Sequence, residues 1–183
     1  VEQELPRVGI HPEFLYQASR YRDNRYTEGM KKAMQNRELI KDCLNEYRDE
    51  EHKMKKDDVY WPIAAFCCKC NKDTTEITGY DGEYGVSYKC ASCGHEEHGD
   101  LRTSKEFKLG WRVDWPMRWN EEKVIFEPGG KDHISPGGSY DTAKLVSKKI
   151  YGWDAPVTMK YDFVSLKGVP GKMASSKGNV VAL

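Results

Sequence analysis

The sequence has no long hydrophobic run and no excess of charge of either sign. Its longest weakly polar stretch, residues 60–68, is far shorter than the roughly 18 to 20 residues that span a bilayer. Lys and Arg together number 29, and so do Asp and Glu, which gives a net charge of zero. We therefore expect no membrane segment and no uniformly basic surface for nucleic acid, although a local basic patch is compatible with this balance.

Two features of a complete secreted or cytoplasmic chain are also missing. Residues 1–7 contain neither an initiator Met nor the charged-then-apolar arrangement of a signal peptide. Residues 179–183 finish in an apolar run without a closing turn. We expect the chain to be a piece of a longer, cytoplasmic protein.

The composition that is present suits a folded core in one or two small domains. Hydrophobic residues make up 38%, and the 16 glycines bring the apolar share into the normal globular range. Changes in composition after residue 58 and near residue 106 predict a helical part (1–58), a cysteine-rich part (59–106) and a part with strands and helices (107–183). In the first part we expect Asn24 and Asn36 to cap two amphipathic helices.

Four cysteines form two CxxC pairs that are nineteen residues apart. Cys67 and Cys70 make the first pair, Cys90 and Cys93 make the second, and Gly94 follows it. This spacing is typical of a zinc site with four thiolates, in which each CxxC turn supplies two sulfurs. Because four thiolates leave no position for water, we expect a structural Zn²⁺ in a zinc-ribbon subdomain.

Other interpretations of the cysteine-rich part remain open. Two disulfides could use the same cysteines, although the lack of a secretory signal disfavours them, and iron could replace zinc. Cys68 competes with Cys67 as a ligand, and we favour Cys67 because of the spacing. His95 and His98 could replace a thiolate, but with four cysteines at hand we expect them to be solvated.

A strand, a Gly-rich turn, a helix and a second strand are expected over residues 123–127, 128–139, 140–151 and 157–164. This order is typical of a βαβ unit, which is half of a doubly wound α/β domain. Open α/β sheets bind ligands beyond the carboxyl ends of their strands, which is where Asp132 and His133 fall. We also expect the amides of Gly137 and Gly138 to be free to bind phosphate or carboxylate where the helix begins.

The last segment is basic. Residues 163–183 contain Lys167, Lys172 and Lys177 and no acidic residue, among Gly, Pro and Ser. Such a lysine-rich loop is usually only a solvated face. Its ammonium groups would also suit a polyphosphate whose charge increases in a transition state.

Several motifs, in this order, resemble those of one enzyme family. KMASSKGN at 172–179 resembles the KMSKS signature loop of class I aminoacyl-tRNA synthetases, and GKDH at 130–133 resembles the GxD signature of their second half. Together with WRVDWPMRW at 111–119, FEPGGKDH at 126–133 and GGSYDT at 137–142, they resemble class I lysyl-tRNA synthetases. The resemblance covers residues 59–183 well and residues 1–58 only in their helical character.

This resemblance implies an activity and a set of site residues. Members activate L-lysine to lysyl-adenylate with ATP and Mg²⁺ and transfer the lysyl group to tRNA(Lys). The positions that match the lysine pocket of the family are Trp111, His133 and Tyr161. Those assigned to ATP are Gly130, Asp132, Gly137, Gly138, Lys172 and Met173. The catalytic group is Lys172, Ser176 and Lys177, since Ala174 and Ser175 depart from the family loop and leave Lys177 as the second cation.

The expected fold is therefore α/β: the second half of a class I synthetase Rossmann fold with an inserted helical and zinc-ribbon subdomain. The HxGH or HxGN signature of the first half occurs nowhere in the chain. We thus expect the fragment alone to activate lysine poorly or not at all. Two other functions remain: a zinc-ribbon module that binds RNA without catalysis, and a class I synthetase for another amino acid.

Overall fold

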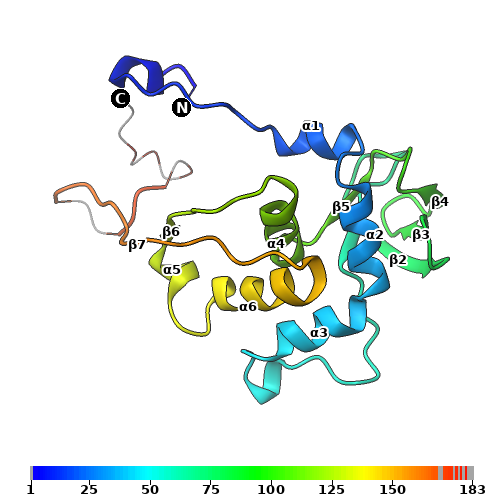
Figure 1. The fold of residues 1–183 in the computed structure, drawn as a ribbon. Coiled ribbons are helices and arrows are strands. Elements are labelled where there is room, and N and C mark those ends of the chain that lie inside the picture. The colour runs from blue at the N-terminus through cyan, green and yellow to red at the C-terminus, as the bar shows by residue number, and fades with distance from the viewer. Residues whose placement is uncertain (1, 169–170, 175, 177, 179, 181–183) are drawn as a thin grey trace.

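The computed structural model describes residues 2–168, 171–174, 176, 178 and 180. Within them the chain has a mixed α/β fold, with short helices and three small sheets (Figure 1). None of the helices in this part of the chain is long and apolar enough to cross a membrane. A mixed α/β class is thus confirmed, while the Rossmann and zinc-ribbon assignments stay predictions.

Three short α-helices, not two, make up the first part. They are α1 (Gln17–Arg22), α2 (Thr27–Gln35) and α3 (Arg37–Asn45). The 3₁₀-helix η1 (Leu5–Val8) precedes them, and a second 3₁₀-helix, η2 (Glu50–His52), follows them. Asn24 caps neither neighbouring helix. Its φ is 54°, and its side-chain amide donates to the carbonyl of Arg102 at 2.8 Å. The contact to a residue 78 positions away overrides its local preference for a helix N-cap.

Asn36 stands at the expected position but acts differently. It is the residue before α3, yet its side-chain amide donates backward to the carbonyl of Lys32 at 2.8 Å. Only one residue separates α2 from α3, so the last carbonyls of α2 lie within its reach. Asn36 therefore satisfies the end of α2 instead of the start of α3.

The apolar faces of α2 and α3 pack on elements from the last third of the chain. Their buried apolar residues are Met30, Ala33, Met34, Ile40, Cys43 and Leu44. Gly29 lies so close to Met117 that an added Cβ would be 2.7 Å from its Cγ. The hydroxyl of Tyr151 donates to the carbonyl of Gly29 at 3.2 Å. The helical part and the last part thus share one hydrophobic core.

The cysteine-rich part, together with the strand that directly follows it, forms two antiparallel sheets, seen beside α2 in Figure 1. In one, β1 (Ile63–Ala65) pairs with β5 (Phe107–Leu109). In the other, the strand order is β2 (Thr75–Tyr80), β3 (Gly85–Cys90) and β4 (Glu96–Asp100). The first CxxC turn follows β1, and the second lies between β3 and β4. The two sheets therefore bring both turns to one place.

The last part begins with α4 (Trp111–Glu121) and continues through β6 (Gly129–Gly130), α5 (Lys131–Ile134), α6 (Ser139–Val146), the π-helix η3 (Ser147–Tyr151) and β7 (Lys160–Tyr161). β6 and β7 pair in parallel, and a parallel bridge joins Phe126 to Val157. The predicted parallel pairing across a helical connection is confirmed.

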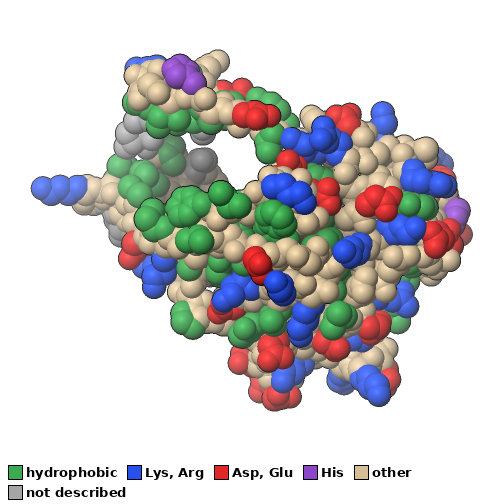
Figure 2. Space-filling view, in the orientation of Figure 1, with side chains coloured by type: hydrophobic (Ala, Val, Ile, Leu, Met, Phe, Trp, Pro, Cys, Tyr) green, Lys and Arg blue, Asp and Glu red, His purple; other side chains and the backbone are tan. Residues whose placement is uncertain are grey.

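The strands of that unit are much shorter than predicted. Residues 123–127 and 157–164 supply only the bridge and the two-residue strand β7, because in the described residues each segment pairs on one side alone. Ile125 and Val157 are 76% and 71% exposed. Figure 2 shows hydrophobic side chains gathered over the loop that leads from α4 to β6. The β-branched pattern here belongs to a surface that none of the described residues buries.

Candidate functional site

A row of three indoles follows one face of α4. Trp111, Trp115 and Trp119 are four residues apart, which places them on the same side of an α-helix. The ring centroids of Trp111 and Trp115 are 6.4 Å apart, and those of Trp115 and Trp119 are 5.0 Å apart. Trp119 is buried, whereas Trp111 is 51% exposed. The row runs from the core of the protein to its surface.

A carboxylate fixes the inner part of this row. Glu127 accepts the indole N–H of Trp115 with Oε1 at 2.9 Å and that of Trp119 with Oε2 at 2.5 Å. Sequence reasoning missed Glu127, although an acidic residue directly before Pro-Gly-Gly at the end of an expected strand was a signal. Its negative charge is held at the N–H edges of two indole rings.

The outer end of the row opens into a cleft of about 300 Å³. The cleft is lined by Trp111, Trp115, Arg118, Glu127, Pro128, Gly129, Gly130, His133 and Tyr161. The rings of Trp111 and His133 are 5.8 Å apart in an edge-to-face arrangement. Tyr161 reaches the cleft because β7 pairs with β6, opposite Gly130. The structure thus brings together Trp111, His133 and Tyr161 from three separate elements.

A side chain at either glycine on the floor of the cleft would displace a neighbouring side chain. An added Cβ would lie 2.6 Å from the side chain of Ile134 at Gly129, and 2.7 Å from Oδ1 of Asp132 at Gly130. Asp132 itself does not line the cleft, although its Oδ2 is 4.0 Å from Nε2 of His133. Nδ1 of His133 lies 2.9 Å from the hydroxyl of Ser139, which fixes the orientation of the ring.

The prediction of free amides at the start of α6 is wrong for this conformation. The N–H of Gly137 donates to the carboxylate of Asp141 at 2.9 Å, and that of Gly138 donates to the carbonyl of Ser135 at 2.8 Å. Asp141 lies in the first turn of the helix, where a carboxylate is favoured by the helix dipole. The protein's own acid occupies the place predicted for a phosphate.

The lysine loop lies next to β7. Nζ of Lys172 is 4.6 Å from the ring centroid of Phe163, two residues beyond Tyr161, and the N–H of Met173 donates to the carbonyl of Val164 at 3.2 Å. Ser176 is exposed. Lys177 falls outside the described residues. Neither Lys172 nor Met173 lines the cleft, and neither does Phe163.

The four predicted cysteine ligands converge. Their sulfurs all lie within 4.8 Å of one another, with 3.6 Å between Cys67 and Cys93 and 3.7 Å between Cys70 and Cys90. A tetrahedral zinc with bonds of 2.3 Å needs sulfurs about 3.8 Å apart, whereas a disulfide needs about 2.05 Å. The geometry fits a metal and excludes the two-disulfide alternative in this structure. We call this group the four-cysteine cluster.

The electrostatics of the cluster also favour a cation. Burial disfavours the thiolate of Cys90, but N–H groups of Cys93 and Ser92 stabilise it and bring its pKa below the usual value. The N–H of His95 favours a Cys93 thiolate, but burial and the three neighbouring sulfurs outweigh it and raise the pKa of Cys93. The backbone thus stabilises one thiolate, that of Cys90. Additional thiolates in the cluster would repel it unless a metal ion compensates their negative charge.

Cys68 lies outside the cluster. Its sulfur is 3.2 Å from Nε2 of His95 and 3.5 Å from a carboxylate oxygen of Glu97. The prediction that His95 is solvated is therefore wrong, since its ring contacts Cys68 and Glu97. His95 also does not replace a thiolate of the cluster. His98 contacts the hydroxyl of Ser87 at 2.9 Å.

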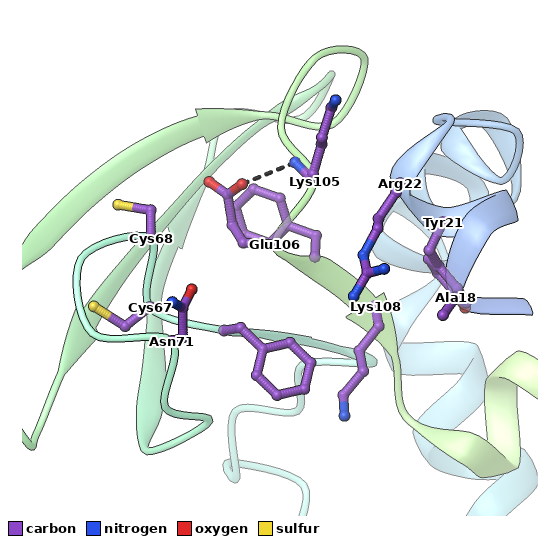
Figure 3. A pocket seen from close by; sticks show the side chains of 11 residues that line it. Ala18, Tyr21, Arg22, Cys67, Cys68, Asn71, Lys105, Glu106 and Lys108 are labelled. Atoms are coloured by element: carbon purple, nitrogen blue, oxygen red, sulfur yellow. Dashed lines mark hydrogen bonds between the residues drawn. The ribbon is translucent and has the colours of Figure 1, made fainter.

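A second and larger hollow, about 690 Å³, lies between α1 and the first CxxC turn (Figure 3). Its lining includes the cationic side chains of Arg22, Lys105 and Lys108, and Nζ of Lys108 is 4.4 Å from the ring centroid of Phe66. It shares no residue with the aromatic cleft. The larger volume alone does not make it the reaction site, because the residues of the predicted lysine pocket line the smaller cleft.

Comparison with known proteins identifies the family. The family described as tRNA synthetases class I (K) matches residues 1–183. Curated proteins named lysine--tRNA ligase are 52% identical over 183 residues in Treponema pallidum, 48% over 182 in Borreliella burgdorferi and 44% over 182 in Thermococcus kodakarensis. Each match covers 100% of this chain and 34% of the relative, so the chain spans about a third of their length. The chain therefore belongs to the class I tRNA synthetase (K) family.

Proposed function

We propose that this chain is part of a cytoplasmic lysine--tRNA ligase that activates L-lysine with ATP and then transfers the lysyl group to tRNA(Lys). The observation that carries the proposal is the convergence of Trp111, His133 and Tyr161 on one cleft. The names of the relatives support it, since all three compared proteins are lysine--tRNA ligases. The same names disfavour a synthetase for another amino acid.

The cleft suits the side chain of lysine. An ammonium group against the half-exposed ring of Trp111 would gain about 0.5 to 2 kcal/mol, depending on desolvation, and would share that ring with the guanidinium of Arg112, 4.9 Å from its centroid. Glu127 adds a negative charge whose position is fixed by two indole N–H groups. His133 and Tyr161 line other sides of the cleft and carry polar atoms for the α-amino and α-carboxylate groups of lysine. Recognition would thus combine one fixed carboxylate with aromatic walls.

In the activation step, the lysine carboxylate attacks the α-phosphate of ATP, and the bond from that phosphate to pyrophosphate breaks. Gly130 allows a close approach of the nucleotide, and Asp132 would bind ribose hydroxyls beside His133. Lys172, Met173, Ser176 and Lys177 form the loop whose cations stabilise the charge on the phosphates, and Mg²⁺ would arrive with ATP. Phosphate binding at Gly137 and Gly138 would require Asp141 to move.

The parallel pair β6–β7 with α6 between them would be part of a Rossmann catalytic domain. The exposed side chains of Ile125, Phe126 and Val157 would then contact the remaining two thirds of a full-length ligase. The four-cysteine cluster would hold a structural Zn²⁺, since its donor set and spacing match that ion. The Zn²⁺ would fix the two CxxC turns without taking part in the reaction.

A chimera tests the proposal. Residues 1–183 would replace the matched third of the Treponema pallidum ligase, and lysine-dependent ATP–pyrophosphate exchange would be measured. Trp111→Ala should raise the KM for lysine by about 2- to 30-fold, as the cation–π energy implies. Trp61→Phe, which lies away from the cleft, is the control. An unchanged KM in Trp111→Ala would contradict the lysine pocket, and full exchange by residues 1–183 alone would contradict the predicted need for the missing part.

RNA contact is a second function that one observation favours. Arg22, Lys105 and Lys108 line the 690 Å³ hollow next to the first CxxC turn, which suits a phosphate backbone. Lys105→Ala and Lys108→Ala should each lower the slope of log affinity against log salt by about one unit in tRNA binding. The control is Lys53→Ala, because Lys53 is exposed and does not line this hollow, so the slope should stay unchanged. If RNA binding is the only function, Trp111→Ala will not affect the exchange reaction and lysine will not bind the cleft.

A further inference from the structure

We propose that Cys68, His95 and Glu97 bind a second divalent metal ion on the outer side of the cysteine-rich part. The sulfur of Cys68 is 3.2 Å from Nε2 of His95 and 3.5 Å from Oε2 of Glu97, and the latter two atoms are 3.1 Å apart. None of these residues belongs to the four-cysteine cluster or to the aromatic cleft. We call this group the outer site.

The three separations match the edges of a tetrahedron around a metal ion. Zinc bonds of about 2.3 Å to sulfur and 2.0 to 2.2 Å to nitrogen and oxygen place the ligand atoms about 3.3 to 3.6 Å from one another. The observed triangle is only slightly smaller. A small shift of side-chain torsions would suffice to place an ion at its centre.

A hydrogen-bonded catalytic triad does not explain this arrangement. In such a triad the carboxylate orients one ring nitrogen of the histidine while the other contacts the nucleophile. Here the sulfur of Cys68 and the carboxylate of Glu97 both contact Nε2 of His95. A single N–H at Nε2 could reach both only as a weaker three-centre hydrogen bond, and Nδ1 takes no part in either contact. Three donor atoms that converge on one point are instead what a cation requires.

The donors come from elements that are fixed relative to one another. The N–H of Cys68 donates to the hydroxyl of Tyr88 at 3.0 Å, and Tyr88 stands opposite Glu97 in the β3–β4 register. The carbonyl of His95 accepts the N–H of Cys90 at 2.8 Å. Tyr88 is itself buried. The outer site is therefore largely preformed before an ion binds.

The donor set selects a borderline ion. One thiolate, one imidazole and one carboxylate suit Zn²⁺ or Co²⁺ better than Mg²⁺ or Ca²⁺, which prefer oxygen ligands. Two anionic ligands neutralise a divalent charge. Cys68 is exposed, and the side chains of His95 and Glu97 are 27% and 37% exposed, so the fourth position faces water. The outer ion should accordingly exchange more readily than an ion in the four-cysteine cluster.

Cadmium-113 NMR of the whole chain, loaded with excess Cd²⁺, tests this proposal. We expect two resonances, one with the shift of four sulfur ligands and one far upfield with a single sulfur. Cys68→Ser should remove only the second resonance. Glu97→Gln should weaken the second site by about tenfold or more, because even loss of an outer-shell partner costs 10- to 100-fold. Cys43→Ser, a lone buried cysteine, should keep both resonances.

Retention of the four-sulfur resonance in Cys68→Ser shows that the variant is folded. A single resonance in the unsubstituted chain would overturn the proposal, and so would a second resonance that survives Cys68→Ser. Loss of both resonances in Cys68→Ser, together with an unchanged second site in Glu97→Gln, would assign Cys68 to the cluster and also overturn it. The result does not depend on the ligase proposal, since no substrate is present.

Discussion

The indole N–H of Trp119 donates to the carboxylate of Glu127 at 2.5 Å, which ties the buried end of α4 to the edge of the cleft. The other carboxylate oxygen accepts Trp115. A change at Glu127 should therefore affect both the stability of the core and the affinity of the cleft.

Glu127→Gln should lower the free energy of unfolding by about 1 to 3 kcal/mol, because the amide NH₂ faces an indole donor and leaves it without an acceptor. The variant should also bind L-lysine more weakly, since the charge is lost. Urea unfolding and calorimetric titration measure the two effects. Glu121→Gln, an exposed residue at the end of α4, should stay within about 0.5 kcal/mol. Equal stability of the two variants would sink the proposed role of Glu127.

Loss of metal should destabilise the cysteine-rich part. Cys70→Ser should abolish the four-sulfur coordination and lower the melting temperature, whereas Cys43→Ser should leave metal content unchanged. Metal affinity should rise with pH, because burial and the neighbouring sulfurs raise the pKa of Cys93 and its proton must leave on binding. Metal analysis after dialysis at several pH values measures both. A Cys70→Ser protein that keeps a full equivalent of tightly bound metal would contradict the assignment.

The protein should lose stability in alkaline solution. Burial raises the pKa of Tyr60 to about 12, and burial also raises the pKa of Tyr21, with the nearby carboxylate of Asp114 adding to it. In the unfolded chain these phenols ionise near pH 10, so between about pH 10 and 12 the unfolded state is favoured as pH rises. Tyr60→Phe should flatten this fall in unfolding free energy, and the exposed Tyr47→Phe should not. A fall of equal slope in both variants would refute this explanation.

Gly29 should be intolerant of a side chain. Gly29→Ala would place a Cβ 2.7 Å from Cγ of the fully buried Met117, and such overpacking costs about 1 to 3 kcal/mol. Alanine's better helix propensity returns at most about 1 kcal/mol. Thermal unfolding should show a lower melting temperature. The double variant Gly29→Ala, Met117→Ala should lose less than the sum of the single variants, and strict additivity would show that the two residues do not conflict.

Short-range patterns in the sequence predicted what depends on neighbouring residues. Two residues between cysteines place two sulfurs on one turn, so Cys67, Cys70, Cys90 and Cys93 could be named together before any fold was known. The order of strand, turn, helix and strand predicted a parallel pairing, which formed beside the predicted first strand: β6 lies in the predicted turn, and residues 123–127 contribute only the bridge of Phe126 to Val157. Each of these follows from local backbone geometry, which the sequence determines directly.

Only the tertiary structure decided which polar groups meet across long distances in the chain. The sequence predicted Asn24 as a helix cap, but its side chain donates to the carbonyl of Arg102. It also predicted free amides at Gly137 and Gly138, but these donate to Asp141 and Ser135. Glu127 gained its role from two indoles, and Cys68 from strand β4. Residue types state what a group can bind, but the free energy of burial and strand pairing selects its partner from the whole chain.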